Sequence, residues 1–522
     1  MLLTVTVVLS IVAVIVVQKI WWGSNITRLP FPPGPPRKWL VGNLLDFPKT
    51  RPWLTFREWT KEYGDIVYLD VPFKPIIVVG SVKVANDLLD GRSSMYSDRP
   101  YSPMIELLGW DWTITFMPNN SVWRTRRRYF HKYFGPSVLH QYHTILLQEI
   151  HAVLSRTLEQ PDEVQQNIRN FPGSTIVRVA YGARDASQLR EYVDLAERAL
   201  ETSRRFLVPG AFLVELFPVL RYLPSWLPGG DGKRFAEAYR PVVVEVQNKP
   251  FNEVKAAMAA SKALPSVTYS LIREFQLEDV QGAMAEELDE TAKSVVGSAY
   301  GAAADTTTAA SEAFVLAMAM FPEVQRTAHA ELDRVVGSSR LPDFRDLESL
   351  VYVRAVMLET IRWMPTVPTG IPHSASTDDE YNGYHIPKGT TVIVNAWAIL
   401  HDPNDYPEPE KFMPERYLDK DGKIDLNVRD PTAVAFGFGR RKCAGFDFAL
   451  ISLHMFMASM LHVYRMEAGV DSLGQPLVLS GEGSDQGISS PITFPRHVRP
   501  RSVKAERLIR DIVLAEDFAG EQ

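Results

Sequence analysis

Residues 436–445 read FGFGRRKCAG and contain Cys443, the only cysteine among the 522 residues of the chain. The glycines around this cysteine predict a loop whose backbone amides can point at the sulfur. These amides, the neighbouring cations and the N-terminus of a helix predicted over residues 446–453 favour the thiolate, so we expect a lowered pKa for Cys443. A thiolate in such a loop is a suitable axial ligand for haem iron. The alternative is a buried structural cysteine, the usual role of a lone cysteine, but the neighbouring residues favour the ligand.

The rest of the chain predicts a mainly helical fold with a smaller β region. Apolar segments at residues 65–69 and 75–79 are typical of strands, and residues 378–394 predict two strands around the turn signal Asn382-Gly383. Helical periodicity dominates from about Pro136 onward.

Two predicted helices matter most for function. The first runs from about Met284 to Phe321 and would be about 50 Å long. Its middle, residues 297–304, consists almost entirely of small residues, which would let a flat ligand or another backbone approach closely. The second covers Leu350 to Met364, and each helix stops at a proline.

Asp305 and Thr306 place a carboxylate beside a hydroxyl in the middle of the long predicted helix. A carboxylate among small apolar residues is costly unless it meets a partner or has a function. The pair is suited to proton relay, in which the alcohol hydrogen-bonds dioxygen and the acid connects it to water. In the alternative, the Thr306 hydroxyl only bonds back to its own helix.

The stretch around Cys443 is similar to the haem-binding signature of cytochromes P450, Phe-x-x-Gly-x-Arg-x-Cys-x-Gly. Phe436, Gly439, Arg441, Cys443 and Gly445 carry the match. The resemblance implies that Cys443 is the axial ligand of haem b, that Arg441 contacts a haem propionate and that Phe436 shields the sulfur.

Further motifs resemble the same family. Glu359 and Arg362 form a Glu-x-x-Arg pair that begins 84 residues before Cys443 (443 minus 359), where the family has this motif. Arg416, in the segment FMPERY, resembles the arginine that completes a buried Glu-Arg-Arg cluster. Bidentate pairing would make such a cluster rigid, so we expect it to have a structural role behind the haem.

The acid and alcohol of the long helix also match the family pattern, at Asp305 and Thr306. Ala303 stands where the family usually has glycine. We expect this methyl group to narrow the groove over the haem while leaving the acid–alcohol pair intact.

Residues far from Cys443 in the sequence also resemble family positions that contact the haem propionates. Trp123 and Arg127 resemble the family's Trp-x-x-x-Arg pair, and Arg99 and His373 are weaker correspondences. All are implied propionate contacts, although an ordinary hydrogen-bonded histidine is the alternative at His373. The other arginines of the run 124–128 are expected to face outward, towards an acidic redox partner.

The chain divides into four segments. Residues 1–22 predict one N-terminal transmembrane helix, because the stretch is almost free of charged residues and long enough to cross a bilayer. A proline-rich hinge (23–36), a haem-binding monooxygenase domain (37–500) and a C-terminal tail (501–522) follow. Residues 206–228 are apolar but broken by prolines, so we expect them to dip into the membrane interface.

The charge distribution around the predicted anchor determines the expected location. Basic residues follow the apolar stretch, which predicts an endoplasmic reticulum membrane protein with its catalytic domain on the cytosolic side. A cleaved signal peptide is the alternative, but no Lys or Arg precedes the stretch and no small-residue cleavage site follows it.

Composition excludes several classes of protein. With 46% hydrophobic residues, 23% charged residues and a net charge of -6, the chain resembles neither a disordered nor a multi-span membrane protein. The mild acidity does not support nucleic-acid binding. The residues Gly481-Glu482-Gly483 lack the rest of a dinucleotide fingerprint. We therefore expect electrons from a separate NADPH-cytochrome reductase.

The family resemblance implies a monooxygenase that inserts one atom of O2 into a hydrophobic small molecule and reduces the other to water. The chain looks like fungal microsomal members, which implies a role in secondary metabolism. The alternatives are a haem-thiolate isomerase or dehydratase that needs no electrons, and a non-enzymatic haem-binding sensor. The segments expected to line the substrate pocket, several of them apolar, are residues 101–117, 206–216, 298–302, 366–371 and 483–489.

Overall fold

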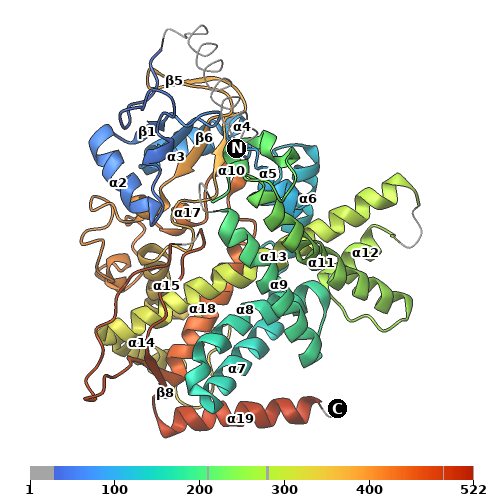
Figure 1. Ribbon diagram of the computed structural model, residues 1–522. Helices are drawn as coiled ribbons and strands as arrows, with labels where there is room; N and C mark the ends of the chain where they lie inside the picture. The colour runs from blue at the N-terminus through green and yellow to red at the C-terminus, as the bar shows by residue number, and fades with distance from the viewer. Residues whose placement is uncertain (1–28, 208–210, 278–280, 486, 521–522) are drawn as a thin grey trace.

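The computed structural model describes residues 29–207, 211–277, 281–485 and 487–520. The predicted transmembrane helix, residues 1–22, lies outside these residues. Figure 1 shows a mainly helical body with most strands gathered at one end, beside the short helices α2 to α4. The prediction of a mainly helical fold with a smaller β region is therefore confirmed.

The helices vary from one turn to 38 residues in length. They are α2 (Pro52–Tyr63), α3 (Val82–Asn86), α4 (Ser93–Tyr96), α5 (Pro103–Leu108), α6 (Ser121–Phe134), α7 (His143–Glu159), α8 (Val164–Tyr181), α9 (Ala186–Phe206), α10 (Leu213–Leu216), α11 (Asp231–Ala259), α12 (Val267–Glu274), α13 (Ala283–Met320), α14 (Pro322–Val335), α15 (Val351–Trp363), α16 (Ala396–Leu400), α17 (Thr432–Ala435), α18 (Phe446–Val463) and α19 (Val503–Gly520). The two long helices predicted from the sequence correspond to α13 and α15, each within two residues of its predicted ends.

The strands form one mixed sheet and two hairpins. The mixed sheet has the order β1 (Ile66–Leu69), β2 (Ile76–Val79), β6 (Thr391–Val394) and β3 (His373–Ser374), with β2 and β6 parallel and the other pairs antiparallel. The hairpins are β4 (Asp379–Tyr381) with β5 (Tyr384–Ile386), and β7 (Tyr464–Ala468) with β8 (Arg496–Pro500).

The β4–β5 turn has the conformation that its sequence predicts. Asn382 and Gly383 both have positive φ angles, of 53° and 78°, as a two-residue hairpin turn requires. The region predicted as two strands contains a third, β6, which leaves this hairpin to join the mixed sheet.

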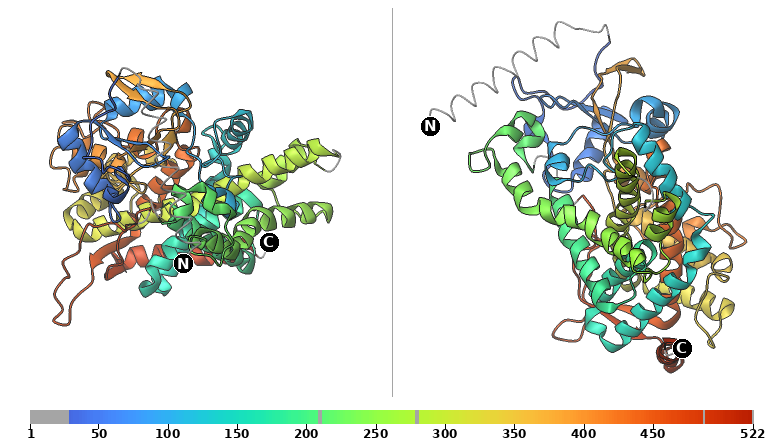
Figure 2. Two further views of the ribbon diagram at one scale, coloured as in Figure 1. Left: turned by 45° about the horizontal axis from the view of Figure 1, so that its top comes forward. Right: turned by 90° about the vertical axis from the view of Figure 1, so that its right-hand side faces the viewer.

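Helix α13 is the centre of the helical body. It packs against α8, α6, α9, α15 and α18. Gly297 lets the segment between α5 and α6 approach α13, since a Cβ there would come within 2.7 Å of the Trp112 ring. Figure 2 shows α11, α12 and the N-terminal part of α13 projecting from this body.

Helix α18 is the one helix among the described residues that is long and apolar enough to cross a membrane, but 72% of that span is buried inside the protein. Its hydrophobicity is therefore explained by packing against α7, α13, α14 and α15. Helix α19 lies within the segment predicted as a C-terminal tail, and its buried residues Ala505 and Ile509 face the body.

Candidate active site

The cysteine loop joins α17 to the N-terminus of α18. The backbone N–H of Cys443 donates to the carbonyl of Phe436 (2.8 Å), and the Phe436 ring packs edge-on against Phe446 (5.0 Å between centroids). Gly439 has a φ of 51°, and a Cβ there would lie 2.0 Å from the carbonyl oxygen of Leu89. Glycine is therefore required at this position of the loop.

The electrostatics of Cys443 differ from the prediction. The Gly445 N–H and the charges of Arg127 and Lys442 lower the thiol pKa, as expected, but burial raises it by more, and the net pKa is raised. The expected lowering was wrong because desolvation of a thiolate outweighs these contacts in the chain alone. A metal ion on the sulfur would supply the missing positive charge, since a coordinating thiol is deprotonated outright.

Cys443 is exposed even though burial dominates its pKa. Both observations hold if the side chain faces an open internal space. Ala302 in α13 is also exposed, although residues 307–318 of the same helix are all buried. These open surfaces fit a prosthetic group between α13 and the cysteine loop.

Four basic side chains converge beside this loop. Arg99 donates to the carbonyls of residues 371 and 372 (2.8 and 2.7 Å), and Arg441 donates to those of residues 97 and 117 (2.7 and 2.8 Å). His373 contacts the carbonyl of residue 96 (2.8 Å), and Arg127 reaches the carbonyl of Lys442. The indole of Trp123 stacks under Arg441, 4.0 Å from its guanidinium carbon. The structure thus brings together every residue that the sequence predicts at the propionates.

Three of these groups, Arg99, Arg127 and Arg441, form a concentration of positive charge, and the buried His373 lies beside them. Burial, then Arg441 and Arg127, lower the pKa of Arg99 well below its ordinary value. Burial lowers the pKa of Arg441 to about 10, against the attraction of Asp98. Burial and the charge of Arg99 lower the pKa of His373 to about 3. Such a cluster is stabilised by an anion, and the two propionates of a haem fit this requirement.

Asp305 has a partner that the sequence did not predict. Its two carboxylate oxygens accept from Nη2 and Nε of Arg204 in α9, at 2.6 and 3.1 Å. The two residues are 101 positions apart, so no local spacing connects them. The only sequence feature that could have pointed to Arg204 is its place as a cation near the end of an amphipathic helix. Many surface helices have such a cation, so this feature does not single out Arg204.

The hydroxyl of Thr306 donates to the carbonyl of Ala302 (2.8 Å). This is the back-bonded arrangement considered as the alternative in the sequence analysis. It does not exclude relay, because a hydroxyl that donates one hydrogen bond still has two lone pairs with which to accept others. Helix α13 stays continuous through Ala303, where the family pattern has glycine.

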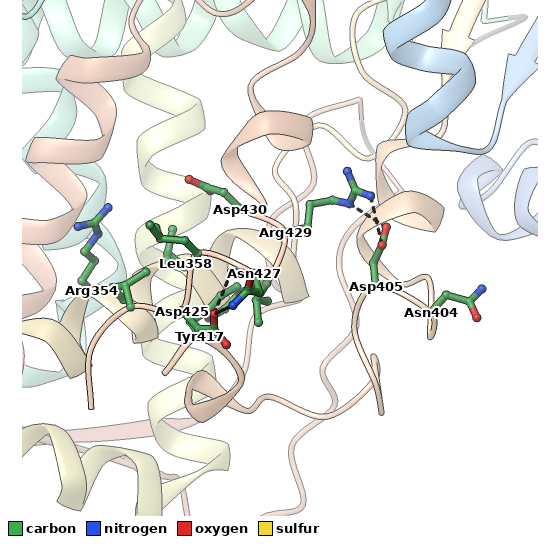
Figure 3. A pocket seen from close by; sticks show the side chains of 12 residues that line it. Arg354, Leu358, Asn404, Asp405, Tyr417, Asp425, Asn427, Arg429 and Asp430 are labelled. Atoms are coloured by element: carbon green, nitrogen blue, oxygen red, sulfur yellow. Dashed lines mark hydrogen bonds and ion pairs between the residues drawn. The ribbon is translucent and has the colours of Figure 1, made fainter. Parts of the chain in front are cut away.

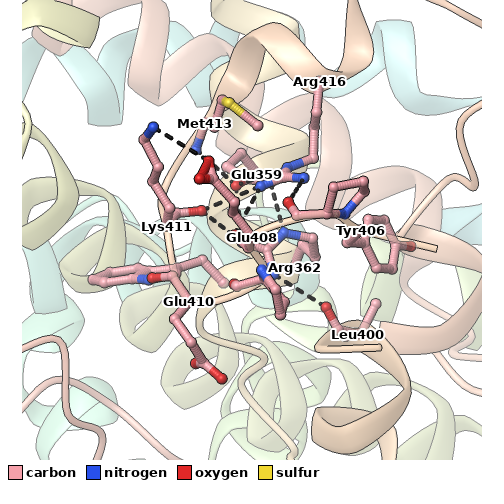
Figure 4. Close-up of polar contacts among 12 residues, drawn as sticks. Glu359, Arg362, Leu400, Tyr406, Glu408, Glu410, Lys411, Met413 and Arg416 are labelled. Atoms are coloured by element: carbon pink, nitrogen blue, oxygen red, sulfur yellow. Dashed lines mark hydrogen bonds and ion pairs between the residues drawn. The ribbon is translucent and has the colours of Figure 1, made fainter. Parts of the chain in front are cut away.

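Glu359, Arg362 and Arg416 form one cluster, as Figure 4 shows, and their side chains are buried. Arg362 forms a fork with Glu359 through Nε (2.7 Å) and Nη2 (2.8 Å), and Nε of Arg416 lies 3.2 Å from the same carboxylate. The backbone N–H of Met413 also donates to Glu359 (2.8 Å). Arg362 completes its bonds with the carbonyls of residues 400, 409 and 411. The cluster therefore ties α15 to the segment that precedes the cysteine loop.

The arginine run in α6 faces two ways. Arg124 and Arg128 are exposed, as predicted. Arg126 is only partly exposed, and its guanidinium donates to the carbonyl of Trp112 (3.3 Å). The prediction that it faces outward was wrong, because helical periodicity turns Arg126 towards the segment that precedes α6.

A separate hollow lies near the buried cluster, between α15 and residues 424–430 (Figure 3). It has a volume of about 460 Å³, and the ion pair between Arg429 and Asp405 lies on its edge. It contains none of the residues proposed for chemistry. Among the described residues there is also no group of three or more His, Cys, Asp or Glu side chains that could hold a metal ion. Cys443 as a single protein ligand fits a porphyrin that supplies the other donors.

Comparison with known proteins assigns the chain to a class. A family model described as Cytochrome P450 matches residues 32–477. "Cytochrome P450 monooxygenase COX1" of Coprinopsis cinerea is 39% identical over 491 residues, which is 93% of this chain and 94% of that protein. "Cytochrome P450 monooxygenase 98" of Postia placenta is 39% identical, covering 92% of both chains. "Cytochrome P450 monooxygenase ple1" of Rhodocybe pseudopiperita is 38% identical, covering 92% of this chain and 91% of that one.

Proposed function

The chain belongs to the cytochrome P450 family and is a monooxygenase, and on this premise we propose that it oxidises a hydrophobic small molecule with electrons from a separate NADPH-cytochrome reductase. One atom of O2 enters the substrate and the other leaves as water. The observation that carries the proposal is the partly buried cluster of Arg99, Arg127, Arg441 and His373 beside an open cysteine.

The prosthetic group is proposed to be haem b. When bound, it supplies the iron that binds and activates oxygen. Cys443 would bind the iron through its sulfur, and Phe436, whose carbonyl accepts the Cys443 N–H, would shield that sulfur. The four basic residues would hold the propionates, and Trp123 would support Arg441 from below. The Glu359 cluster would keep the cysteine loop in place without touching the group.

Asp305 and Thr306 are proposed to deliver protons. Formation of one water per turnover consumes two protons, which a group linked to solvent must supply. The hydroxyl of Thr306 can accept a hydrogen bond while it donates to Ala302. Asp305 is held by Arg204 at the side of the helix, so this ion pair would position the acid and have to loosen when the acid transfers a proton.

The substrate is proposed to be hydrophobic because apolar groups surround the expected reaction space. The rings of Phe116 and Phe206 meet edge to face at 5.6 Å. Leu207 lies close to Gly487, where a Cβ would approach the leucine side chain to 3.0 Å. Three of the segments expected to line the pocket thus meet, and the side chains at these contacts are apolar.

We also propose that the protein is anchored in the endoplasmic reticulum membrane by residues 1–22, with the catalytic domain in the cytosol. The described residues support a membrane-facing side, because Leu213, Val219, Tyr222 and Trp226 are exposed by 48%, 64%, 78% and 76%. These residues lie in the segment predicted to dip into the interface. Sedimentation of the full chain with microsomes after a high-salt wash is expected, and full release by salt would contradict the anchor.

The test of the function is electron-dependent turnover of the full chain with the reductase and NADPH. The wild type should consume NADPH and O2 together, and Thr306→Ala should release a larger share of the O2 as hydrogen peroxide. Thr308→Ala is the matched control, because Thr308 bonds back to Ala304 (2.7 Å) in the same helix but is buried.

Two outcomes would contradict the proposal. Product formation without NADPH would favour the isomerase or dehydratase. If Thr306→Ala and Thr308→Ala released the same share of peroxide, Thr306 would have no part in proton delivery.

A further inference from the structure

The segment of residues 110–116, between α5 and α6, borders the proposed reaction space at two places. The carbonyl of Thr115 accepts a hydrogen bond from Nε of Arg99 (3.0 Å), so this part of the segment lies at the basic cluster beside the cysteine loop. The ring of Trp110 lies on α13, where a Cβ on Gly301 would come within 3.9 Å of it. Gly301 directly precedes the open part of α13, so the 110–116 segment reaches the same surface of that helix.

Two serines of α13 fix the backbone of the 110–116 segment. Oγ of Ser294 donates to the carbonyl of Trp112 (2.6 Å), and the backbone N–H of Ile114 donates to Oγ of Ser298 (3.0 Å). All four residues are buried. Breaking either bond would therefore leave a polar group without a partner in the interior, which is costly. The two serines are four residues apart, so they hold the segment to one face of α13 over about one helical turn.

A third contact ties the 110–116 segment to α9 through one hydroxyl group. Nε1 of Trp110 donates to Oγ1 of Thr202 (2.9 Å), and this hydroxyl donates in turn to the carbonyl of Ala199 (2.6 Å). Trp110 is 2% exposed, and Thr202 has no exposed surface. Phe206, one turn further along the same face of α9, meets Phe116 edge to face at 5.6 Å. One face of α9 therefore positions both the first and the last side chain of the segment.

We propose that Thr202 is a positioning residue for substrate selection, which holds Trp110 and thereby fixes Phe116 beside the reaction space, so that the site accepts hydrophobic molecules of one shape. The proposal rests on the proposed monooxygenase function, because the partly exposed Phe116 belongs to a segment expected to line its pocket. A segment bonded to two helices can adapt to a ligand of another shape only by breaking buried hydrogen bonds. Sites that re-pack easily bind many ligands, whereas a fixed site discriminates among them.

The hydroxyl of Thr202 decides whether the contact with Trp110 forms. Valine resembles threonine in shape but has no hydroxyl, so Thr202→Val leaves the buried indole N–H without an acceptor. The observed position of the segment then becomes less favourable relative to displaced ones, which makes room for a bulkier ligand. A purely structural Thr202 would change the Tm and leave the discrimination between ligands unchanged.

The experiment measures how tightly two imidazoles of different size bind to the haem-loaded full-length protein. Imidazole and N-triphenylmethylimidazole can both bind ferric haem iron through a ring nitrogen, which shifts the Soret band, but the second carries a bulky apolar group. The Kd of each is determined by Soret titration for the wild type, Thr202→Val, Thr202→Ser and Ser203→Ala, well below the Tm of every variant. Neither titration requires turnover or a known substrate.

Thr202→Val should lower the ratio of the two Kd values, bulky to small, by about tenfold, as expected when a buried donor loses its partner. Thr202→Ser keeps a hydroxyl and should retain the wild-type ratio. Ser203→Ala is the matched control, because the buried Ser203 hydroxyl bonds only back to the carbonyl of Leu200 (2.7 Å) within α9. A ratio in Thr202→Val that equals or exceeds that of Ser203→Ala would overturn the proposal.

The carbon-monoxide difference spectrum of each variant shows whether it is folded and loaded. If Thr202→Val does not load haem, Ser294→Ala takes its place with the same expected result, because it removes the hydroxyl that bonds the Trp112 carbonyl. An unchanged ratio in a loaded variant refutes the positioning role and leaves the monooxygenase function standing. If the wild type gives no haem spectrum and no Soret shift with imidazole, the proposed function itself is refuted and the role of Thr202 falls with it.

Discussion

Replacing Glu359 with Gln should destabilise the whole fold. The side chains of Glu359 and Arg362 have no solvent exposure, and that of Arg416 is 4% exposed. The variant keeps the volume of the side chain but leaves two guanidinium groups facing each other without an anion. Removing one partner of a buried ion pair costs about 3–5 kcal/mol, because the remaining charge is uncompensated.

This free energy converts to a modest shift in Tm. At about 2.1 cal/mol/K per residue, the 522 residues have an unfolding entropy of about 1.1 kcal/mol/K. A loss of about 3–5 kcal/mol then lowers the Tm by roughly 3–5 °C. The matched control is Glu58→Gln, whose side chain is 67% exposed and pairs with Lys61 on the surface. Surface pairs contribute about 0–1 kcal/mol, so its Tm should stay within about 1 °C of the wild type.

The assay is thermal unfolding followed by circular dichroism and by loss of the Soret band in the same sample. The two signals should fall together in Glu359→Gln, because the cluster connects α15 to the segment that leads into the cysteine loop. If the Tm of Glu359→Gln equalled that of Glu58→Gln, the cluster would not stabilise the fold as described.

Two further predictions follow from the charges. Arg441→Leu should lose haem to a globin acceptor roughly 10–100 times faster than the wild type, since a charge-assisted hydrogen bond is worth about 1.5–3 kcal/mol. The control is Arg440→Leu, which changes the exposed neighbouring residue. Equal rates of haem loss in the two variants would contradict the prediction. Burial lowers the pKa of His401 to about 3 and those of His454 and His462 to about 4. The pKa of these histidines in the unfolded chain is about 6.5, so below about pH 6.5 the unfolded chain binds more protons than the folded one. Their contribution to the free energy of unfolding is therefore complete above about pH 6.5 and is lost as the pH falls towards about 4. The loss is at most about 1.4 kcal/mol per pH unit for each histidine. Tm measured against pH should fall less steeply in His454→Leu, and parallel curves would refute this.

Local sequence patterns were sufficient to predict much of the fold. The boundaries of α13 and α15 follow from apolar periodicity and from a proline after each helix. The β4–β5 turn follows from Asn382-Gly383, because these residues tolerate positive φ angles. Such features depend on neighbours within a few residues and can therefore be recognised without the fold.

Features that depend on tertiary contacts could not be predicted from the sequence. The partner of Asp305 comes from α9, far away in the chain, and any of several arginines there could have served. The pKa of Cys443 was predicted in the wrong direction because local cations were visible in the sequence and the depth of burial was not. For the same reason Arg126 was expected at the surface, although it contacts a segment packed beside α6.

The candidate site was predictable where a motif fixes the spacing. The residues around Cys443 and the pair at 359 and 362 belong to such motifs. Arg99, Arg127 and His373 are separated by long stretches of chain, so their spacing alone predicts no contact; the family resemblance placed them at the propionates, and the structure shows them beside Arg441.

Thiolate ligation by Cys443 is tested most directly by the reduced, carbon-monoxide-bound difference spectrum of the purified full-length protein beside Cys443→Ser. A Soret band strongly red-shifted relative to histidine-ligated haem, and absent from the variant, is the predicted result. A protein that binds no haem, or a spectrum that does not change in Cys443→Ser, would contradict the assignment of the cysteine loop.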